Sequence, residues 1–172
     1  MKRIRLAVTI AGLMSAATIG AGAASADDYT TLLIDPNFVF DTVQYTGGAP
    51  TMNPGGQPGA ARVFSHNDGR SITDTVWVLP DPAAATAAVT AAQTAAAIAN
   101  PKTEPVQVGT GGTFISGTSA DGSQSLGLLT FTQGNAASTI EFAGPANDPP
   151  DAALATDLGQ AQVALIQSRM GG

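Results

Sequence analysis

The sequence contains no cysteine. We therefore expect no disulfide bond, no thiol catalysis and no thiolate metal site. The same absence leaves no cysteine to carry a lipid anchor after a leader segment, so we do not expect a bacterial lipoprotein. A domain without disulfides must be held together by its hydrophobic core alone.

Basic and aromatic residues are scarce. The 172 residues include seven Lys and Arg against 13 Asp and Glu, which gives a net charge of −6, and aromatic residues make up only 5%. A surface this acidic repels nucleic acid and anionic lipid headgroups at long range, so neither is an expected partner. The richness in alanine, glycine, proline and threonine is typical of a high-GC, actinobacterial genome.

A long apolar run occurs only at the start of the chain. Leu6 to Ile19 form this run after three basic residues, and Ala24-Ser25-Ala26 places small residues before Asp27. This layout is typical of a secretory signal peptide cleaved between Ala26 and Asp27. The run is too short, and too rich in alanine and glycine, for a comfortable membrane span. We predict that residues 1–26 are removed and that residues 27–172 form a single secreted domain, extracellular or associated with the cell wall.

The predicted mature chain is more acidic than the whole sequence. Residues 27–172 keep four basic residues against all 13 acidic ones, so their net charge is 4 − 13 = −9. No further apolar run is long enough to hold this chain in a membrane. A soluble and monomeric protein is the expectation.

The segment 46–60 is rich in glycine and proline and has almost no apolar side chain. It cannot bury enough surface to offset the entropy of ordering it, so we predict a flexible loop. Three interpretations remain open: a lid over a binding site, an interface with a partner, or plain disorder.

The rest of the chain predicts strands and two helices. Asn67-Asp68-Gly69 favours a hairpin turn, and Asp81-Pro82 favours the start of a helix that Asn100-Pro101 ends. Strands are expected at 62–66, 71–79, 105–108, 112–117, 125–133 and 136–144, and helices at 83–99 and from about 151 to 170. This order predicts an α+β fold, a twisted antiparallel β-sheet with two main helices packed on one of its faces.

Three parts of the sequence together resemble a known family. They are DDYTTLLIDP at the mature start, DTVWVLPDPAAATAAV at the entry to the first helix, and a last hairpin that feeds a C-terminal helix. They are similar to the actinobacterial, mostly mycobacterial, exported LpqN/PknH-sensor-like proteins. The resemblance implies a Mog1/PsbP-like fold, a place at the cell envelope, and binding of ligands or proteins rather than catalysis.

This chain departs from that family in two respects. Many relatives carry a lipobox cysteine, so tethering to the envelope does not carry over. The kinase-sensor relatives have disulfides, so their ligand site does not carry over either.

Catalytic and metal-binding patterns are weak. Ser65 and His66 are the residue types of a hydrolase, which makes a small secreted hydrolase the alternative function, but adjacent residues cannot aim at each other as a nucleophile and its base must. The single histidine and the absence of a calcium-loop motif argue against a metal site. We predict that the protein is not an enzyme and that it uses no metal and no cofactor.

The aromatic residues are the remaining candidates for a binding site. They either line an apolar pocket or simply form the core, and the sequence leaves both readings open. The candidates are Phe64, Trp77, Phe114, Phe131 and Phe142. The leading prediction is a secreted, non-catalytic protein that binds a protein partner or an apolar, lipid-like ligand of the envelope.

Overall fold

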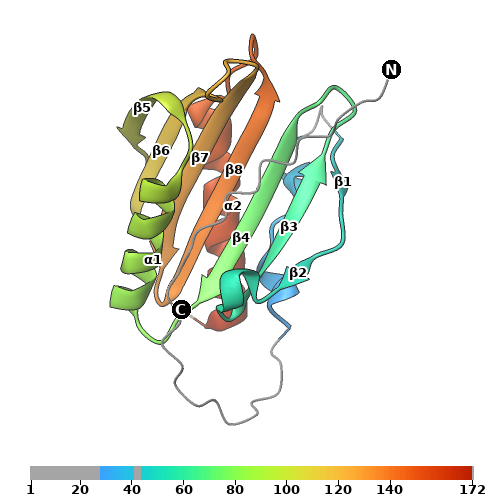
Figure 1. Cartoon of the computed structure of the whole chain (residues 1–172). Coiled ribbons are helices and arrows are strands. Elements are labelled where there is room, and N and C mark those ends of the chain that lie inside the picture. The colour runs from blue at the N-terminus through green and yellow to red at the C-terminus, as the bar shows by residue number, and fades with distance from the viewer. Residues whose placement is uncertain (1–27, 41–43, 172) are drawn as a thin grey trace.

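The computed structural model describes residues 28–40 and 44–171. The predicted signal peptide and its cleavage site at Ala26 and Asp27 lie outside these residues. The described chain forms one antiparallel sheet in which the strands lie in the order β1-β3-β4-β8-β7-β6-β5, with β2 also paired to β3 (Figure 1). The strands are β1 (Thr46–Gly47), β2 (Thr51–Met52), β3 (Gly59–Ser65), β4 (Ser71–Val78), β5 (Ala99–Pro105), β6 (Thr110–Thr118), β7 (Gln124–Gln133) and β8 (Ala136–Pro145).

Two α-helices and three short 3-10 helices complete the fold. They are α1 (Pro82–Ala95), α2 (Ala152–Met170), η1 (Tyr29–Leu32), η2 (Pro36–Phe38) and η3 (Pro54–Gly56). Both α-helices begin where the sequence predicts. The side chain of Asp81 accepts a hydrogen bond from the Ala84 amide, and that of Asp151 accepts one from the Ala153 amide. The predicted α+β fold class is confirmed.

The hairpins also form at the predicted turns. β3 and β4 pair from Gly59 opposite Trp77 to Ser65 opposite Ser71. Gly69, between them, has a φ of +97°, a value that glycine adopts without steric cost. The strands β6, β7 and β8 form a continuous meander, and β8 returns to pair with β4 in the middle of the sheet.

The first helix is shorter than predicted. It ends at Ala95 instead of 99, and the chain from Ala99 to Pro105 becomes the edge strand β5, paired with β6. The alanines favour a helix. Pairing of 99–105 with β6, however, gives hydrogen-bond partners to backbone groups of β6 that would otherwise have none. The predicted strand at 105–108 is correspondingly wrong, because β5 ends at Pro105 and the chain then turns into β6.

The helices pack on opposite faces of the sheet, whereas the sequence predicts both on one face. α1 lies against β7 and β8, where Gln93 Nε2 donates to Thr130 Oγ1 at 2.7 Å. α2 lies against the same two strands from behind, with Leu158 and Leu129 in one cluster (Figure 1). The reason is visible in β7, which is buried without interruption from residue 127 to 132 and so needs cover on both sides.

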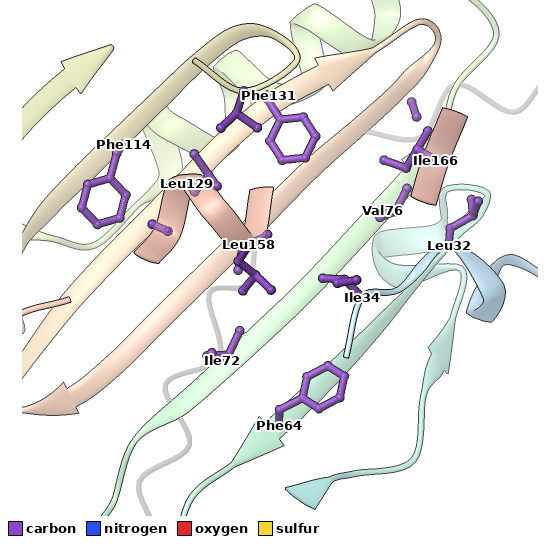
Figure 2. Close-up of a cluster of buried hydrophobic side chains, with 14 residues drawn as sticks. Leu32, Ile34, Phe64, Ile72, Val76, Phe114, Leu129, Phe131, Leu158 and Ile166 are labelled. Atoms are coloured by element: carbon purple, nitrogen blue, oxygen red, sulfur yellow. The ribbon is translucent and has the colours of Figure 1, made fainter. Parts of the chain in front are cut away.

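Most of the core lies between the sheet and α2 (Figure 2). Its largest fully buried apolar side chains are Phe64, Phe114, Phe131, Ile72, Leu129, Ile140, Leu158, Ile166, Val76 and Val108. A second, smaller cluster lies under α1 and consists of Leu79, Ala85, Val89 and Ala137. The alanine-rich helix α1 therefore packs on the sheet mainly through small side chains, as its sequence predicts.

A glycine lets α2 approach the sheet closely. A Cβ atom on Gly159 would lie 2.6 Å from Leu129 Cδ2 and 2.8 Å from Val108 Cγ1. Both neighbouring side chains are fully buried, so they have little room to move.

We expect Gly159→Ala to destabilise the fold by about 1–3 kcal/mol through overpacking, although alanine is the better helix former. Urea unfolding of the variant and the wild type measures this. The control is Ala164→Gly on the exposed side of α2, which should lose about 1 kcal/mol from helix propensity alone. A gain in stability for Gly159→Ala would show that the packing at this point is loose.

Candidate functional site

A surface groove of about 360 Å³ lies where the start of β4 and the end of β8 meet the N-terminus of α2. Val39 and Phe40, after η2, and Tyr45, before β1, complete its wall. The groove is lined by Val39, Phe40, Tyr45, Arg70, Ser71, Ile72, Phe142, Ala143, Gly144, Asp148, Pro149, Pro150, Asp151 and Leu154.

The walls of the groove are mainly apolar. Phe142 packs edge-on against Phe114 of the core, with ring centroids 6.2 Å apart, so one wall continues the core outward. Leu154, in the first turn of α2, is 50% exposed at the rim. An apolar side chain left half open beside a concave surface indicates a place where an apolar group can bind.

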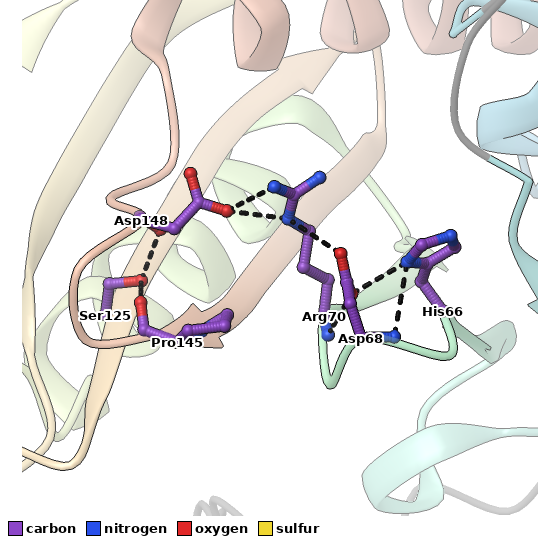
Figure 3. Close-up of polar contacts among 6 residues, drawn as sticks. All are labelled: His66, Asp68, Arg70, Ser125, Pro145 and Asp148. Atoms are coloured by element: carbon purple, nitrogen blue, oxygen red, sulfur yellow. Dashed lines mark hydrogen bonds and ion pairs between the residues drawn. The ribbon is translucent and has the colours of Figure 1, made fainter.

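A polar cluster lies at the groove, which two of its members, Arg70 and Asp148, line (Figure 3). Asp148 Oδ2 accepts hydrogen bonds from Arg70 Nε at 2.7 Å and Arg70 Nη2 at 2.5 Å, and this pairing raises the pKa of Arg70. Ser125 Oγ lies 2.7 Å from the Asp148 carbonyl oxygen and 2.9 Å from that of Pro145, and a single hydroxyl links these two acceptors. The contacts of Arg70 fix the connection between β8 and α2 against the β3–β4 hairpin, and those of Ser125 fix it against β7.

The hairpin turn extends the same cluster. Asp68 lies 3.5 Å from Arg70 and 2.7 Å from His66 Nδ1. The Arg70 backbone amide and the His66 side chain both bond to the Asp68 carboxylate, which lowers its pKa. The His66 ring in turn lies 5.7 Å from the ring of Tyr45, whose pKa is raised by burial.

The other wall belongs to an N-terminal strap, residues 28–40, which is held by two buried polar side chains. The Ile34 amide donates to Asp74 Oδ2 at 2.8 Å and to Gln162 Oε1 at 3.0 Å. Gln162 Nε2 donates to the Leu32 carbonyl oxygen. Asp74 on β4 and Gln162 on α2 are both fully buried, so they tie the strap to the sheet and to the helix at one point.

Burial changes the charge of Asp74. Removal of the carboxyl from water raises its pKa from 3.8 to about 8, an effect that the hydrogen bond from the Ile34 amide only partly opposes. Its second oxygen, Oδ1, has no hydrogen-bond partner among the described residues. The group is therefore mostly protonated and uncharged at neutral pH.

The structure does not gather the five aromatic residues that the sequence suggests for a ligand site. Phe64, Phe114 and Phe131 are 1% exposed or less and belong to the main core (Figure 2). Trp77 faces the other side of the sheet, beside α1, and its Nε1 donates to the Pro54 carbonyl oxygen at 3.0 Å. Phe142 alone of the five lines the groove. A role of the five residues in ligand binding stays a prediction.

Sequence reasoning missed most of the groove. Arg70 and Asp148 are separated by 78 residues, and no local pattern brings them together. The apolar residues of the strap, Val39 and Phe40, carry no signal beyond their apolar character. The doublet Pro149-Pro150 was a usable sign, because it fixes an extended entry into α2 beside the end of β8.

The segment 46–60 is not without regular structure. β1, β2 and η3 lie in it, and both strands pair with β3. Arg62 Nε donates to the Gly48 carbonyl oxygen at 2.8 Å, which adds a further contact to the sheet edge. None of these residues lines the groove. The flexibility of the segment 46–60, and its role as a lid or an interface, stay predictions.

The residues proposed for hydrolysis do not form a catalytic pair. Ser65 is the last residue of β3, and His66 follows it directly, before the turn at 67–69. The His66 ring is engaged by Asp68. Across residues 28–40 and 44–171, no three His, Cys, Asp or Glu side chains gather as they would around a metal ion, and no helix has the length and hydropathy needed to cross a membrane.

Comparison with known proteins gives one likeness of structure. No family model matches the chain, and no curated protein matches its sequence. The extracellular domain of PknH from Mycobacterium tuberculosis superimposes with a TM-score of 0.56 at 13% identity, over 87% of this chain and 100% of that domain. The two share a fold. The predicted PknH-sensor-like architecture is thereby confirmed, whereas kinship with LpqN and with Mog1/PsbP proteins stays a prediction.

The buried carboxyl of Asp74 predicts a pH-dependent stability. Its pKa of about 8 in the folded protein lies above the value of 3.8 for an unperturbed Asp, so folding takes up a proton between these values. The free energy of unfolding should therefore fall as the pH rises from about 6 to about 8, by about 1 kcal/mol per pH unit.

The matched variant is Asp74→Asn, which imitates the protonated carboxyl. Urea unfolding of both proteins across this pH range isolates the contribution of Asp74 from that of other titrating groups. We expect the difference in stability between variant and wild type to grow with pH. A constant difference would show that Asp74 is already ionised in the fold.

Proposed function

We propose that the chain is an exported, non-catalytic binding domain that holds an apolar ligand of the cell envelope in the groove between β4, β8 and α2. The observation that carries this proposal is the apolar lining of a groove of about 360 Å³. This volume lies at the lower end of ligand sites, which span about 300–1,000 Å³. It suits one short alkyl chain or ring system.

Two further observations support this role. The shared fold with an extracellular domain agrees with the export that residues 1–26 predict. Among the described residues that line the groove, Arg70 and Asp148 are engaged with each other, and none is a histidine or a cysteine. The expected place of action is outside the cell, with the cell wall as the nearest source of apolar ligands.

A protein partner is the second candidate, because two large apolar side chains are exposed near this groove. Phe38 is 85% exposed and directly precedes Val39 and Phe40 of the groove wall, while Leu154 is 50% exposed at the rim. Exposed aromatic and aliphatic side chains beside a groove also suit the anchor residues of a protein interface. A protein would cover Phe38, whereas a small ligand would leave it open.

The experiment is native mass spectrometry of the chain purified from a secretory actinobacterial host, followed by lipid extraction. We expect an adduct of lipid mass on the wild type. Leu154→Gln should weaken or abolish it, because the substitution places an amide at the rim of the groove.

The matched control is Val63→Gln. Val63 is 46% exposed, similar to Leu154, but it lies on β3 and does not line the groove. An adduct that survives Leu154→Gln would place the ligand elsewhere. A clean mass without adduct, combined with a protein captured by the wild type and lost on Phe38→Ala, would favour the second candidate.

A further inference from the structure

The charges around the groove are uneven. Among the described residues, three charged side chains line it, Arg70, Asp148 and Asp151, and a fourth, Asp68, lies 3.5 Å from the guanidinium of Arg70. Three carboxylates thus lie at or beside the groove with a single arginine. Two further titratable groups are His66, paired with Asp68, and Tyr45, whose ring lies 5.7 Å from that of His66. The same bias holds for residues 27–172 as a whole, which carry four basic and 13 acidic residues.

Arg70, the one cation among the described residues that line the groove, is already engaged. Arg70 contributes Nε and Nη2 to the carboxylate of Asp148, and its Nε also faces Asp68. An anionic group at Arg70 would meet the carboxylate of Asp148, which is already bonded to the guanidinium, and that of Asp68, 3.5 Å from it. The groove therefore disfavours a ligand with a carboxylate or phosphate next to its apolar part.

The positive end of the helix dipole of α2 is occupied as well. Asp151 caps the helix by accepting the Ala153 amide with Oδ1 at 2.9 Å. Its side chain is exposed at the groove, and no ion pair within the described part of the chain includes it. Asp151 therefore offers a carboxylate at the rim, close in sequence to the apolar side chain of Leu154.

We propose that the ligand of this groove is a cationic amphiphile, a molecule with a short apolar chain and an ammonium or similar cation. The inference rests on the proposed function and adds the charge of the ligand to it. The apolar chain lies along Phe142 and Leu154, and the cation lies at the rim beside the carboxylates of Asp148 and Asp151. The pairing of an acidic rim with an apolar wall is the complementarity that selects this ligand over an anionic one.

The test compares three probes with the same alkyl chain, namely octyltrimethylammonium, octanoate and octan-1-ol. Each is titrated below its micelle concentration into the ¹⁵N-labelled chain at neutral pH and low salt, and binding is followed by amide chemical shifts around Phe142 and Leu154. We expect the ammonium probe to bind at least about threefold more tightly than octanoate, a ratio typical of exposed ion pairs. Added salt should reduce this ratio.

The matched variants are Asp151→Asn and Asp81→Asn. Each keeps a capping side chain at the start of an α-helix and removes one negative charge, but Asp81 lies at α1 and does not line the groove. Asp151→Asn should lower the preference for the ammonium probe, and Asp81→Asn should leave it unchanged.

The outcomes separate this inference from the proposed function. If octan-1-ol shifts the groove amides and the ammonium probe binds no better than octanoate, the ligand charge is wrong and the apolar site stands. The same conclusion follows if Asp151→Asn leaves the preference intact. If none of the three probes shifts the groove amides, both the inference and the apolar site are overturned.

Discussion

The fold depends on a sheet whose central strands are buried on both faces. β7 is buried without interruption from residue 127 to 132, and β8 from 136 to 140. Such strands are stable only when cover lies on both sides, and each face receives it from a different part of the chain. α1 covers one face with slim alanine side chains, while α2 and the strap cover the other with larger apolar groups.

The groove follows from how the second face is covered. α2 lies over β7 and β8, and the strap lies over β3, so two separate elements cover this face of the sheet. Asp74 and Gln162 join them at Ile34, and the ion pair of Arg70 with Asp148 joins the hairpin to the start of α2. Between these two points of attachment the cover is incomplete, and the partly exposed Phe142 lies in the groove wall. The candidate site is therefore the part of the core that no element of the described chain covers.

Local chemistry was sufficient to predict most elements of the fold. Asp81 and Asp151 cap their helices, and Gly69 and Gly134 adopt the positive φ values of the expected turns. The predicted end of α1 was wrong because the pairing of 99–105 with β6 outweighs the helix propensity of alanine.

Contacts distant in sequence could not be predicted in this way. The contact of Arg70 with Asp148 joins side chains 78 positions apart in the sequence. The placement of the helices on opposite faces depends on the burial of β7 from both sides. The aromatic residues were the natural candidates for a pocket, but an aromatic ring fills a core as readily as it lines a site. Three of the five lie in the core, so composition alone could not separate the two roles.

The edge strand β5 has a consequence for how this protein avoids assembly with other chains. An outermost strand presents unpaired backbone groups on which another chain can add. Pro101 and Pro105 each remove a backbone donor from this edge, and Lys102 and Glu104 place charges between them. A bulge between Ala99 and Lys102 further interrupts its regularity. These features of β5 oppose the addition of another strand, and therefore oppose assembly into fibrils, in a chain that has no disulfides.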